Sequence, residues 1–234
     1  MKFQNLGIIQ ARIGSKRLKN KMVLRLDSHR ILDWVIKRCK LSKSIDKLVI
    51  ATSTKTNDDL ICHIANENEI EFFRGSENDV LKRFYLTYKK YNSSNVTRIC
   101  ADNPFIDPIE LDKLYDFFIK NSLDYSCNHQ QKFKNKYPDG FGAEIFTSEA
   151  LNKINEKAFL SHHREHVTSY IYDNLNEFKI STPVASEKIN FPKLKFDIDT
   201  SHDYNYLKKL VEKGVHINSS AEDIVSIAKK LITY

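Results

Sequence analysis

The chain has 234 residues, of which 41% are hydrophobic and 29% are charged, and its 37 Lys and Arg against 30 Asp and Glu give a formal net charge of +7. This composition excludes a disordered chain, and we expect a single α/β domain over residues 1–234. No apolar run approaches the ~18 residues of a membrane span, and the first residues are too polar for a secretion signal. We therefore expect a cytoplasmic protein with no membrane partner. The basic balance fits anionic substrates and nucleic acid equally well.

Segments with strand and helix patterns alternate along the first half of the chain. Apolar residues at helical spacing, as at Ile31, Leu32, Val35 and Ile36, mark the helices, and short apolar runs mark the strands. The expected strands are residues 6–9, 47–51, 71–73 and 96–100, and the expected helices are residues 31–40, 58–67, 80–88 and a segment that begins at Pro108. This alternation predicts a mostly parallel sheet joined by right-handed crossovers.

The pattern loosens after residue 125. Residues 128–142 are polar and rich in turn signals, which predicts a flap or lid over a site, because a long polar loop in a compact domain usually carries function. Beyond this segment we expect strands at residues 143–146, 178–182 and 195–199, helices at residues 148–157 and 165–174, and two closing helices.

The first strand runs into a basic loop, residues 10–21, which holds one glycine and five cations. The cations are Arg12, Lys16, Arg17, Lys19 and Lys21. An α/β sheet binds its ligands at the carboxyl ends of its strands, and guanidinium groups and backbone N–H groups hold phosphates there. We therefore interpret the basic loop as a polyphosphate-binding site; the alternative is an ordinary solvated loop.

Three other strands end in polar residues that should meet the basic loop at the same edge of the sheet. These residues are Ser53, Arg74 and Asp102. Neither Gly-x-Gly-x-x-Gly nor Gly-x-x-x-x-Gly-Lys-Ser/Thr occurs in the chain, which disfavours a nicotinamide-binding protein and a P-loop protein.

Acidic residues follow two of the predicted strands. Asp102 comes after one strand, and Asp197 and Asp199 point the same way from another. Carboxylates beside a polyphosphate are the usual ligands of Mg²⁺, so these three residues predict a Mg²⁺ site. The alternatives are a turn residue for Asp102 and a helix N-cap for Asp199.

Residues 162–166 contain His-x-x-Glu-His, which on a helix would place His162 and His166 on one face, where they could bind zinc. The motif is short and no third ligand is identifiable downstream, which disfavours zinc catalysis. Arg164 is instead a guanidinium suited to hold a substrate carboxylate. The four cysteines form no Cys-x-x-Cys pair, so we expect reduced thiols.

A nucleic-acid-binding module is an alternative from a different class, suggested by the net charge and the eleven tyrosines. The tyrosines cluster on helical faces, for example at Tyr85, Tyr88 and Tyr91, and do not alternate with cations along one sheet. This arrangement disfavours a stacking platform for bases.

Motifs spread in order over nearly the whole chain resemble those of the CMP-sugar-acid cytidylyltransferases, in a branch like the spore-coat polysaccharide biosynthesis protein F type. They are Ile8-Ile9-Gln10-Ala11-Arg12-Ile13-Gly14-Ser15-Lys16-Arg17-Leu18 with Lys21, Ala51-Thr52-Ser53, Phe73-Arg74-Gly75-Ser76, Ala101-Asp102-Asn103-Pro104, Tyr137-Pro138-Asp139-Gly140, Arg164-Glu165-His166 and Asp199-Thr200-Ser201-His202-Asp203. The resemblance implies a three-layer α/β/α fold of the nucleotide-diphospho-sugar transferase (glycosyltransferase A-like) type. The chain departs from the branch at Lys19-Asn20, Ala101 and Ser201-His202.

The resemblance also implies a set of site residues, carried over by position. The nucleotide-binding set is Ala11, Arg12, Gly14, Ser15, Arg17, Lys21, Ser53 and Arg74, with the triphosphate on Arg12, Ser15 and Lys21. The metal would lie on Asp102 and Asp199, and these two acids, Arg12 and Lys21 form the expected catalytic set. Our candidates for the acceptor site are Asn128, Asp139, Glu144 and Arg164.

The resulting hypothesis is an enzyme that transfers CMP from CTP to an anionic sugar acid and releases pyrophosphate, with Mg²⁺ as cofactor and no nucleic acid partner. Two alternatives stay open: a cytidylyltransferase that acts on a phosphate or phosphonate, and a non-catalytic nucleotide-binding protein. The resemblance allows for a homodimer formed through residues 128–142.

Overall fold

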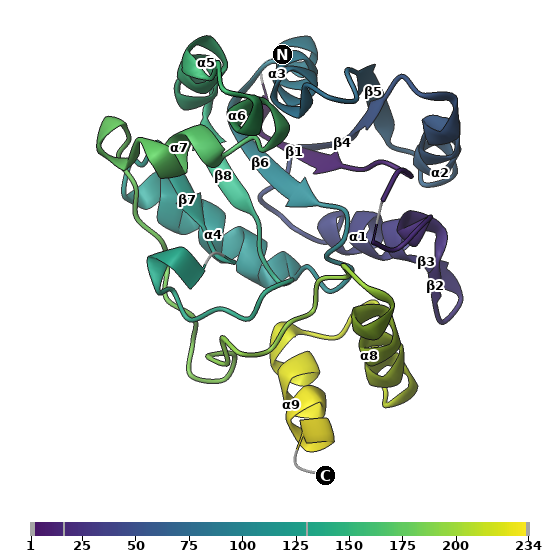
Figure 1. Cartoon of the computed structure of the whole chain (residues 1–234). Coiled ribbons are helices and arrows are strands. Elements are labelled where there is room, and N and C mark those ends of the chain that lie inside the picture. Colours follow the sequence, from purple (N-terminus) through teal and green to yellow (C-terminus); the bar gives the residue numbers. More distant parts are fainter. Residues whose placement is uncertain (1–2, 16, 130, 233–234) are drawn as a thin grey trace.

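The computed structural model describes residues 3–15, 17–129 and 131–232. Its centre is a six-stranded sheet with the strand order β5-β4-β1-β6-β8-β7 (Figure 1). The strands are β1 (Phe3–Gln10), β4 (Lys47–Ser53), β5 (Glu71–Gly75), β6 (Ser93–Cys100), β7 (Tyr125–Cys127) and β8 (Glu144–Thr147). β1, β4, β5 and β6 are mutually parallel, and β8 runs antiparallel to β6 and β7. The prediction of a mostly parallel sheet is therefore confirmed.

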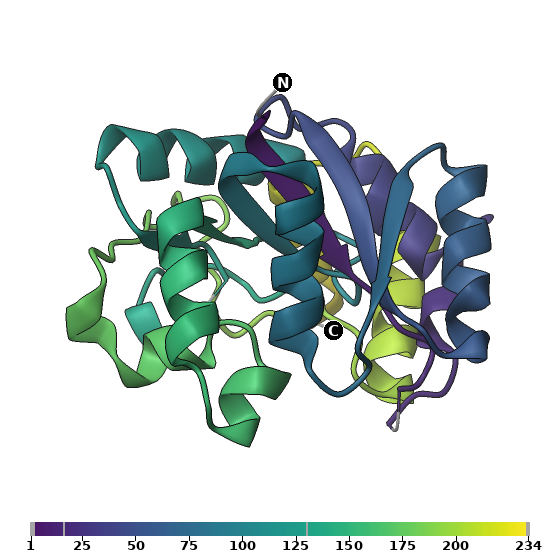
Figure 2. The same ribbon diagram turned by 90° about the horizontal axis from the view of Figure 1, so that it is seen from above.

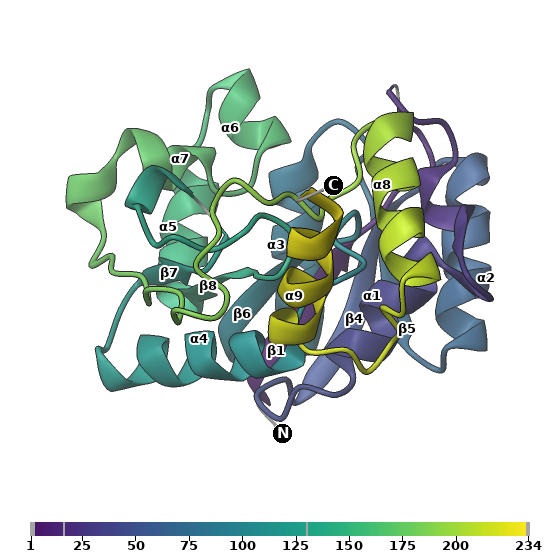
Figure 3. The same cartoon turned by 90° about the horizontal axis from the view of Figure 1, so that it is seen from below.

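Helices cover both faces of the sheet. The α-helices are α1 (Ile31–Cys39), α2 (Asp59–Glu67), α3 (Val80–Tyr91), α4 (Pro108–Lys120), α5 (Ser148–Lys157), α6 (Ser161–Glu165), α7 (Ser169–Asp173), α8 (Ser201–Glu212) and α9 (Ala221–Ile232). Figure 2 shows α3 and α5 over one face, and Figure 3 shows α1, α4 and α9 over the other. Short 3-10 turns lie at Lys21–Val23, Thr56–Asp58, Gln131–Phe133 and Leu175–Glu177, and β2 (Arg25–Leu26) pairs with β3 (His29–Arg30).

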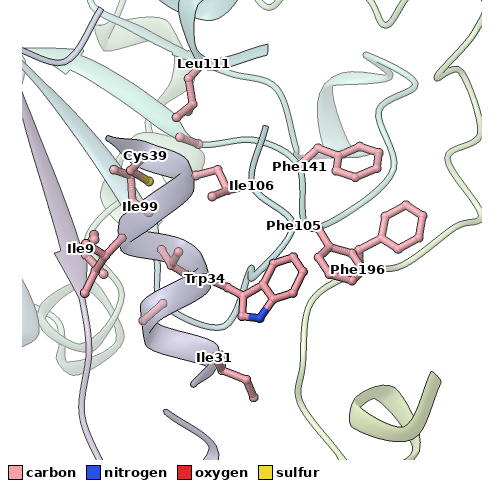
Figure 4. Packing of buried hydrophobic residues seen from close by; sticks show 14 of the residues in the cluster. Ile9, Ile31, Trp34, Cys39, Ile99, Phe105, Ile106, Leu111, Phe141 and Phe196 are labelled. Atoms are coloured by element: carbon pink, nitrogen blue, oxygen red, sulfur yellow. The ribbon is translucent and has the colours of Figure 1, made fainter. Parts of the chain in front are cut away.

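The three layers follow from strands that bury both faces. In β1, Leu6 and Ile8 pack into the core under α3, whereas Ile9 packs into the core on the opposite side. Central parallel strands read as continuous apolar runs for this reason. On the Ile9 side, the rings of Trp34 and Phe105 lie 5.5 Å apart (Figure 4).

Three predicted elements differ from the structure. The expected helix 165–174 is shortened to α7, Ser169–Asp173, because α6 ends at Glu165 and His166 has extended backbone angles. The expected strands 178–182 and 195–199 are wrong: each makes only an isolated bridge, Tyr125 with Ile180 and Asp139 with Lys195. Backbone groups of the second segment bond to loops, as Ile198 N–H does to the Asp102 carbonyl at 2.9 Å, and not to a continuous strand.

Between β7 and β8, the described residues of the segment 128–142 pack against the body of the protein. Asn135, Tyr137 and Phe141 are buried, and Gly140 has a φ of +101°, with its position for a Cβ only 2.6 Å from the Phe196 carbonyl carbon. Only glycine fits such a left-handed, close approach. The role of this segment as a flap, substrate loop or subunit contact stays a prediction.

Within the part of the chain that the structure describes, none of the helices combines the length and apolar character that crossing a membrane requires.

Candidate active site

An open cleft of about 670 Å³ lies at the carboxyl ends of β1 and β6. Its wall is formed by the basic loop after β1, the start of α3, the end of β6, the end of α6 and Asp199, two residues before α8. The predicted residues among those that line it are Ala11, Arg12, Gly14, Ser15, Arg17, Lys21, Asp102 and Asp199. Residues that are far apart in the sequence thus meet at the sheet edge where we expected the site. Lys16 lies outside the described residues.

The basic loop is held from below by a buried carboxylate. The backbone N–H of Ile13 donates to Asp58 Oδ1 at 2.7 Å, and the Ser53 hydroxyl donates to Asp58 Oδ2. Ser53 is fully buried and does not line the cleft. The structure therefore gives Ser53 a supporting position beneath the loop.

Lys21 joins the basic loop to the acids. Its Nζ lies 2.8 Å from Asp102 Oδ2, 2.8 Å from the Ile198 carbonyl and 3.7 Å from Asp199 Oδ1. Arg17 Nη2 donates to the same Asp199 oxygen at 2.8 Å. Two of the three predicted metal ligands, Asp102 and Asp199, therefore form one ionic cluster with two of the loop cations, Arg17 and Lys21.

Asp197 stands next to this cluster with one oxygen satisfied and one not. Oδ2 lies 3.1 Å from Lys195 Nζ, while the buried Oδ1 has no hydrogen-bond partner among the described residues. Burial raises the pKa of Asp197, and burial together with Asp197 raises the pKa of Asp139 to about 6. Together with the carboxylates of Asp102 and Asp199, the unpaired oxygen of Asp197 forms a set of hard oxygen ligands, which fits a Mg²⁺ ion.

Two arginines that line the cleft were not among the predicted site residues. Arg83 on α3 is 3% exposed, and its Nε is buried without a hydrogen-bond partner in the described part of the chain. Burial and then the nearby Arg12 lower the pKa of Arg83 to about 10. Two guanidinium groups that repel each other across a cleft favour a bound anion between them.

Arg98 on β6 is the second of these arginines. Its Nε donates to Gln10 Oε1 at 2.6 Å, its Nη1 bonds to Glu144, and its side chain is 19% exposed toward the cleft. The sequence did carry a signal for both residues: Arg98 interrupts an apolar strand, and Arg83 lies on the buried face of an amphipathic helix. Charges at such positions are rarely without a partner or a ligand.

Three of the four acceptor candidates are engaged inside the protein. Asn128 Oδ1 accepts from Ala143 N–H at 2.8 Å, and its Nδ2 donates to the Glu110 carbonyl at 2.9 Å. Arg164 forms two 2.9 Å bonds to Asp79, which caps the start of α3.

Glu144 is the third candidate engaged inside the protein, and it is fully buried. It accepts from Arg98 and from the hydroxyls of Tyr125 and Tyr172. Burial alone would raise the pKa of Glu144, but Arg98 and these donors outweigh it and hold the pKa at about 2. Glu144 is therefore an ionised internal counterion of Arg98 and has no open face toward a substrate.

Asp139, the fourth candidate, lines a second open pocket of about 580 Å³. Three lysines share this pocket, namely Lys132, Lys193 and Lys195. Arg74 lies elsewhere: its Nε donates to the Ser53 carbonyl at 2.9 Å and its Nη2 to the Lys55 carbonyl at 2.7 Å, outside the residues that line the cleft.

Residues 6–228 match the family described as cytidylyltransferase. The chain belongs to the cytidylyltransferase family. It is 33% identical over 231 residues to the spore coat polysaccharide biosynthesis protein SpsF of Bacillus subtilis, covering 96% of this chain and 94% of that protein. It is 38% identical over 225 residues to an uncharacterised protein of Methanocaldococcus jannaschii, covering 96% of this chain and 90% of that protein.

The solved structure of a cytidylyltransferase from Leptospira borgpetersenii superposes with a TM-score of 0.91 at 31% identity, covering 99% of this chain and 96% of that one. The fold is that of the nucleotidyltransferases of the nucleotide-diphospho-sugar transferase type, as the resemblance implied. As a member of the cytidylyltransferase family, the protein is a CTP-dependent nucleotidyltransferase.

Proposed function

We propose that this cytidylyltransferase transfers CMP from CTP to an anionic sugar acid of the nonulosonate type, releasing pyrophosphate. One observation carries the proposal: the loop cations Arg12 and Lys21 and the acids Asp102 and Asp199 meet in one cleft. Cations for a triphosphate beside oxygen ligands for a divalent metal are the parts that nucleotidyl transfer needs.

The basic loop would bind the triphosphate. Arg12, Lys21 and the buried Arg83 supply positive charge, while Gly14 offers a backbone N–H group and Ser15 a hydroxyl. Arg17 is a helper at the open side of the cleft. Ala11, at the end of β1, would lie against the cytidine.

Ser53 and Arg74 would support the basic loop from beneath, through hydrogen bonds to Asp58 and to the backbone. Ser53 anchors Asp58, which holds the basic loop, and Arg74 binds the Ser53 carbonyl. We propose that both residues position the nucleotide-binding loop without touching CTP.

Asp102, Asp199 and Asp197 would hold Mg²⁺. When bound, the ion supplies charge neutralisation at the phosphates. The residues of the chain supply the rest: Arg12 and Lys21 orient the triphosphate so that the acceptor oxygen faces the α-phosphorus in line, and they offset the negative charge that develops on the departing pyrophosphate. This chemistry requires no covalent nucleophile on the protein.

The acceptor would approach from the pocket that contains Asp139. Lys193 and Lys195 give this pocket the positive charge that a carboxylate or a phosphate requires, and Lys195 also contacts Asp197 of the proposed metal site. Asn128 and Glu144 would shape this region from within, whereas Arg164, bonded to Asp79 at the start of α3, would act beside the first cleft. The lysines also favour the second candidate function, in which the acceptor is a phosphate or phosphonate, because a lysine ammonium binds both classes of anion as a point charge.

The test is pyrophosphate release with Mg²⁺, in which each of the four nucleoside triphosphates is offered against a panel of sugar acids, phosphates and phosphonates. We expect release only with CTP and only with one class of acceptor, and a loss of at least ~10²-fold in the Asp102→Asn variant. Turnover of the variant at the rate of the unsubstituted protein would refute the proposed site. Silence of the whole panel, with no rise in melting temperature on adding CTP, would refute the proposed function.

A further inference from the structure

A group of metal-ligating side chains lies outside both pockets described above. The Nε2 atoms of His162 and His163 on α6 lie 2.9 and 2.8 Å from one oxygen, Asp173 Oδ2, at the end of α7. The ligand atoms of all three residues lie within 4.8 Å of one another. None of the three lines the cleft or the lysine-rich pocket.

This group differs from the one that the sequence motif suggests. Within His-x-x-Glu-His, a continuous helix would pair His162 with His166. In the structure α6 ends at Glu165, His166 has extended backbone angles, and the His166 side chain lines the cleft. The partner that completes the group is Asp173, seven residues after the motif and on another helix.

We propose that His162, His163 and Asp173 bind a Zn²⁺ ion through two imidazole nitrogens and one carboxylate oxygen, with water as the fourth ligand. Imidazole and carboxylate are common zinc ligands at distances of roughly 2.0–2.2 Å, and tetrahedral coordination places its donors roughly 3.3 Å apart. The two nitrogen–oxygen distances, 2.9 and 2.8 Å, therefore need to lengthen by only about half an ångström, and all three donor atoms already lie within 4.8 Å of one another.

The local charges suit a cation. Asp173 places the negative charge of a carboxylate beside the two imidazole rings. Arg164 is the nearest cation on α6, and its charge is paired with Asp79. His162 and Asp173 are each 53% exposed at their side chains, which leaves a path for the ion and its water, while His163 is 6% exposed and provides a fixed ligand.

The alternative is a simple histidine–aspartate pair. His163 Nδ1 is buried without a hydrogen-bond partner among the described residues. Nδ1 would also lack a partner with zinc bound, because His163 uses Nε2 both to bind zinc and to bond to Asp173. The unpaired Nδ1 therefore favours neither the zinc site nor the simple pair. A single zinc ion replaces two hydrogen bonds to one oxygen with three coordination bonds.

Zinc at this position would join α6 to α7 and stiffen one wall of the cleft. Arg164, between the histidines and the cleft residues Glu165 and His166, ties α6 to Asp79 at the start of α3. We therefore expect zinc to raise the melting temperature of the protein.

The test uses the full-length, tag-free protein after removal of metals. ZnCl₂ is titrated in competition with a chromophoric chelator, with excess Mg²⁺ present to occupy the acids of the cleft. We expect one equivalent of Zn²⁺ to bind, a rise in melting temperature, and a visible spectrum of bound Co²⁺ typical of tetrahedral coordination. His162→Ala and Asp173→Asn should each weaken Zn²⁺ binding by at least tenfold.

Two matched variants should keep the binding unchanged. His63→Ala removes an exposed histidine of α2, and Asp102→Asn removes a cleft acid. The proposal is overturned if the unsubstituted protein binds no Zn²⁺, if His162→Ala binds it equally well, or if Asp102→Asn abolishes the binding. The side chains replaced in His162→Ala and Asp173→Asn are half exposed, so the metal-free variants should melt close to the unsubstituted protein. If their melting temperature falls strongly, Asp173→Glu is titrated instead, because it keeps the carboxylate and should retain Zn²⁺ binding.

Discussion

Lys21 Nζ lies 2.8 Å from Asp102 Oδ2, so a cation of the proposed phosphate-binding loop is paired with an acid of the proposed metal site. The Lys21 side chain is 12% exposed and that of Asp102 is 31% exposed. The ammonium group therefore offsets part of the negative charge of Asp102 and Asp199. Under the proposed function, we expect a divalent cation between these two acids to displace the ammonium toward the phosphates.

Replacing Lys21 should separate these two roles. In Lys21→Met, we expect turnover to fall by about 10²–10³-fold, because the triphosphate loses a positioned cation. Affinity for Mn²⁺ without CTP should rise about fivefold, because a partly exposed pair worth up to ~1 kcal/mol no longer competes for Asp102. Electron paramagnetic resonance of free Mn²⁺ measures this affinity. Asp102→Asn should weaken Mn²⁺ binding, and weaker binding in Lys21→Met as well would contradict the competition.

The buried Glu144–Arg98 pair should matter for folding. Glu144→Gln leaves the Arg98 guanidinium without its counterion, which we expect to cost about 3–5 kcal/mol in the free energy of unfolding at pH 7. Urea denaturation of both proteins measures this difference. A loss below ~1 kcal/mol would mean that the pair contributes little to stability.

The same pair sets a pH dependence. The folded pKa of Glu144, about 2, lies below its ordinary value of 4.5, so its ionised form stabilises the folded state above pH 4.5. This contribution is lost as the pH falls through the folded pKa. The stability gap between the unsubstituted protein and Glu144→Gln should therefore narrow from pH 4.5 toward pH 2, as followed by urea denaturation at each pH. A gap that widens in this range would contradict the assignment.

Gly140, in the connection before β8, should tolerate no side chain. Gly140→Ala requires a left-handed residue whose Cβ meets the Phe196 backbone at 2.6 Å, and we expect it to lower the free energy of unfolding by clearly more than ~1 kcal/mol. Gly214 is a matched control, since its φ is +107° but no atom lies within 4 Å of its Cβ position. Thermal unfolding of Gly140→Ala and Gly214→Ala separates the steric clash from the backbone strain. Equal losses of stability in the two variants would mean that the strain alone accounts for the effect.

The lysine-rich pocket should govern the acceptor and not CTP. Lys193→Ala should raise the KM for the acceptor about tenfold, which is ~1.4 kcal/mol of binding, and leave the KM for CTP unchanged. Lys188→Ala, in which an exposed lysine paired with Glu222 is removed, serves as the control in the same steady-state assay. A change in the KM for CTP alone would contradict the placement of the acceptor site in this pocket.

Local sequence patterns determined much of this protein. The alternation of apolar runs and helical spacing predicted the four parallel strands, because strands buried on both faces and amphipathic helices carry their burial in short-range periodicity. The placement of Arg12, Lys21 and Asp102 in one cleft also followed from sequence, since parallel strands bring their carboxyl ends to one edge.

Only the tertiary structure decided which side chains find partners. Arg164 and Glu144 looked like substrate ligands, yet Asp79 and Arg98, distant in sequence, pair with them inside the protein. His162 found Asp173 because the helix expected across residues 165–174 breaks at His166. Burial and pairing of a charged group depend on contacts between elements far apart in the chain, and periodicity within one element carries no record of them.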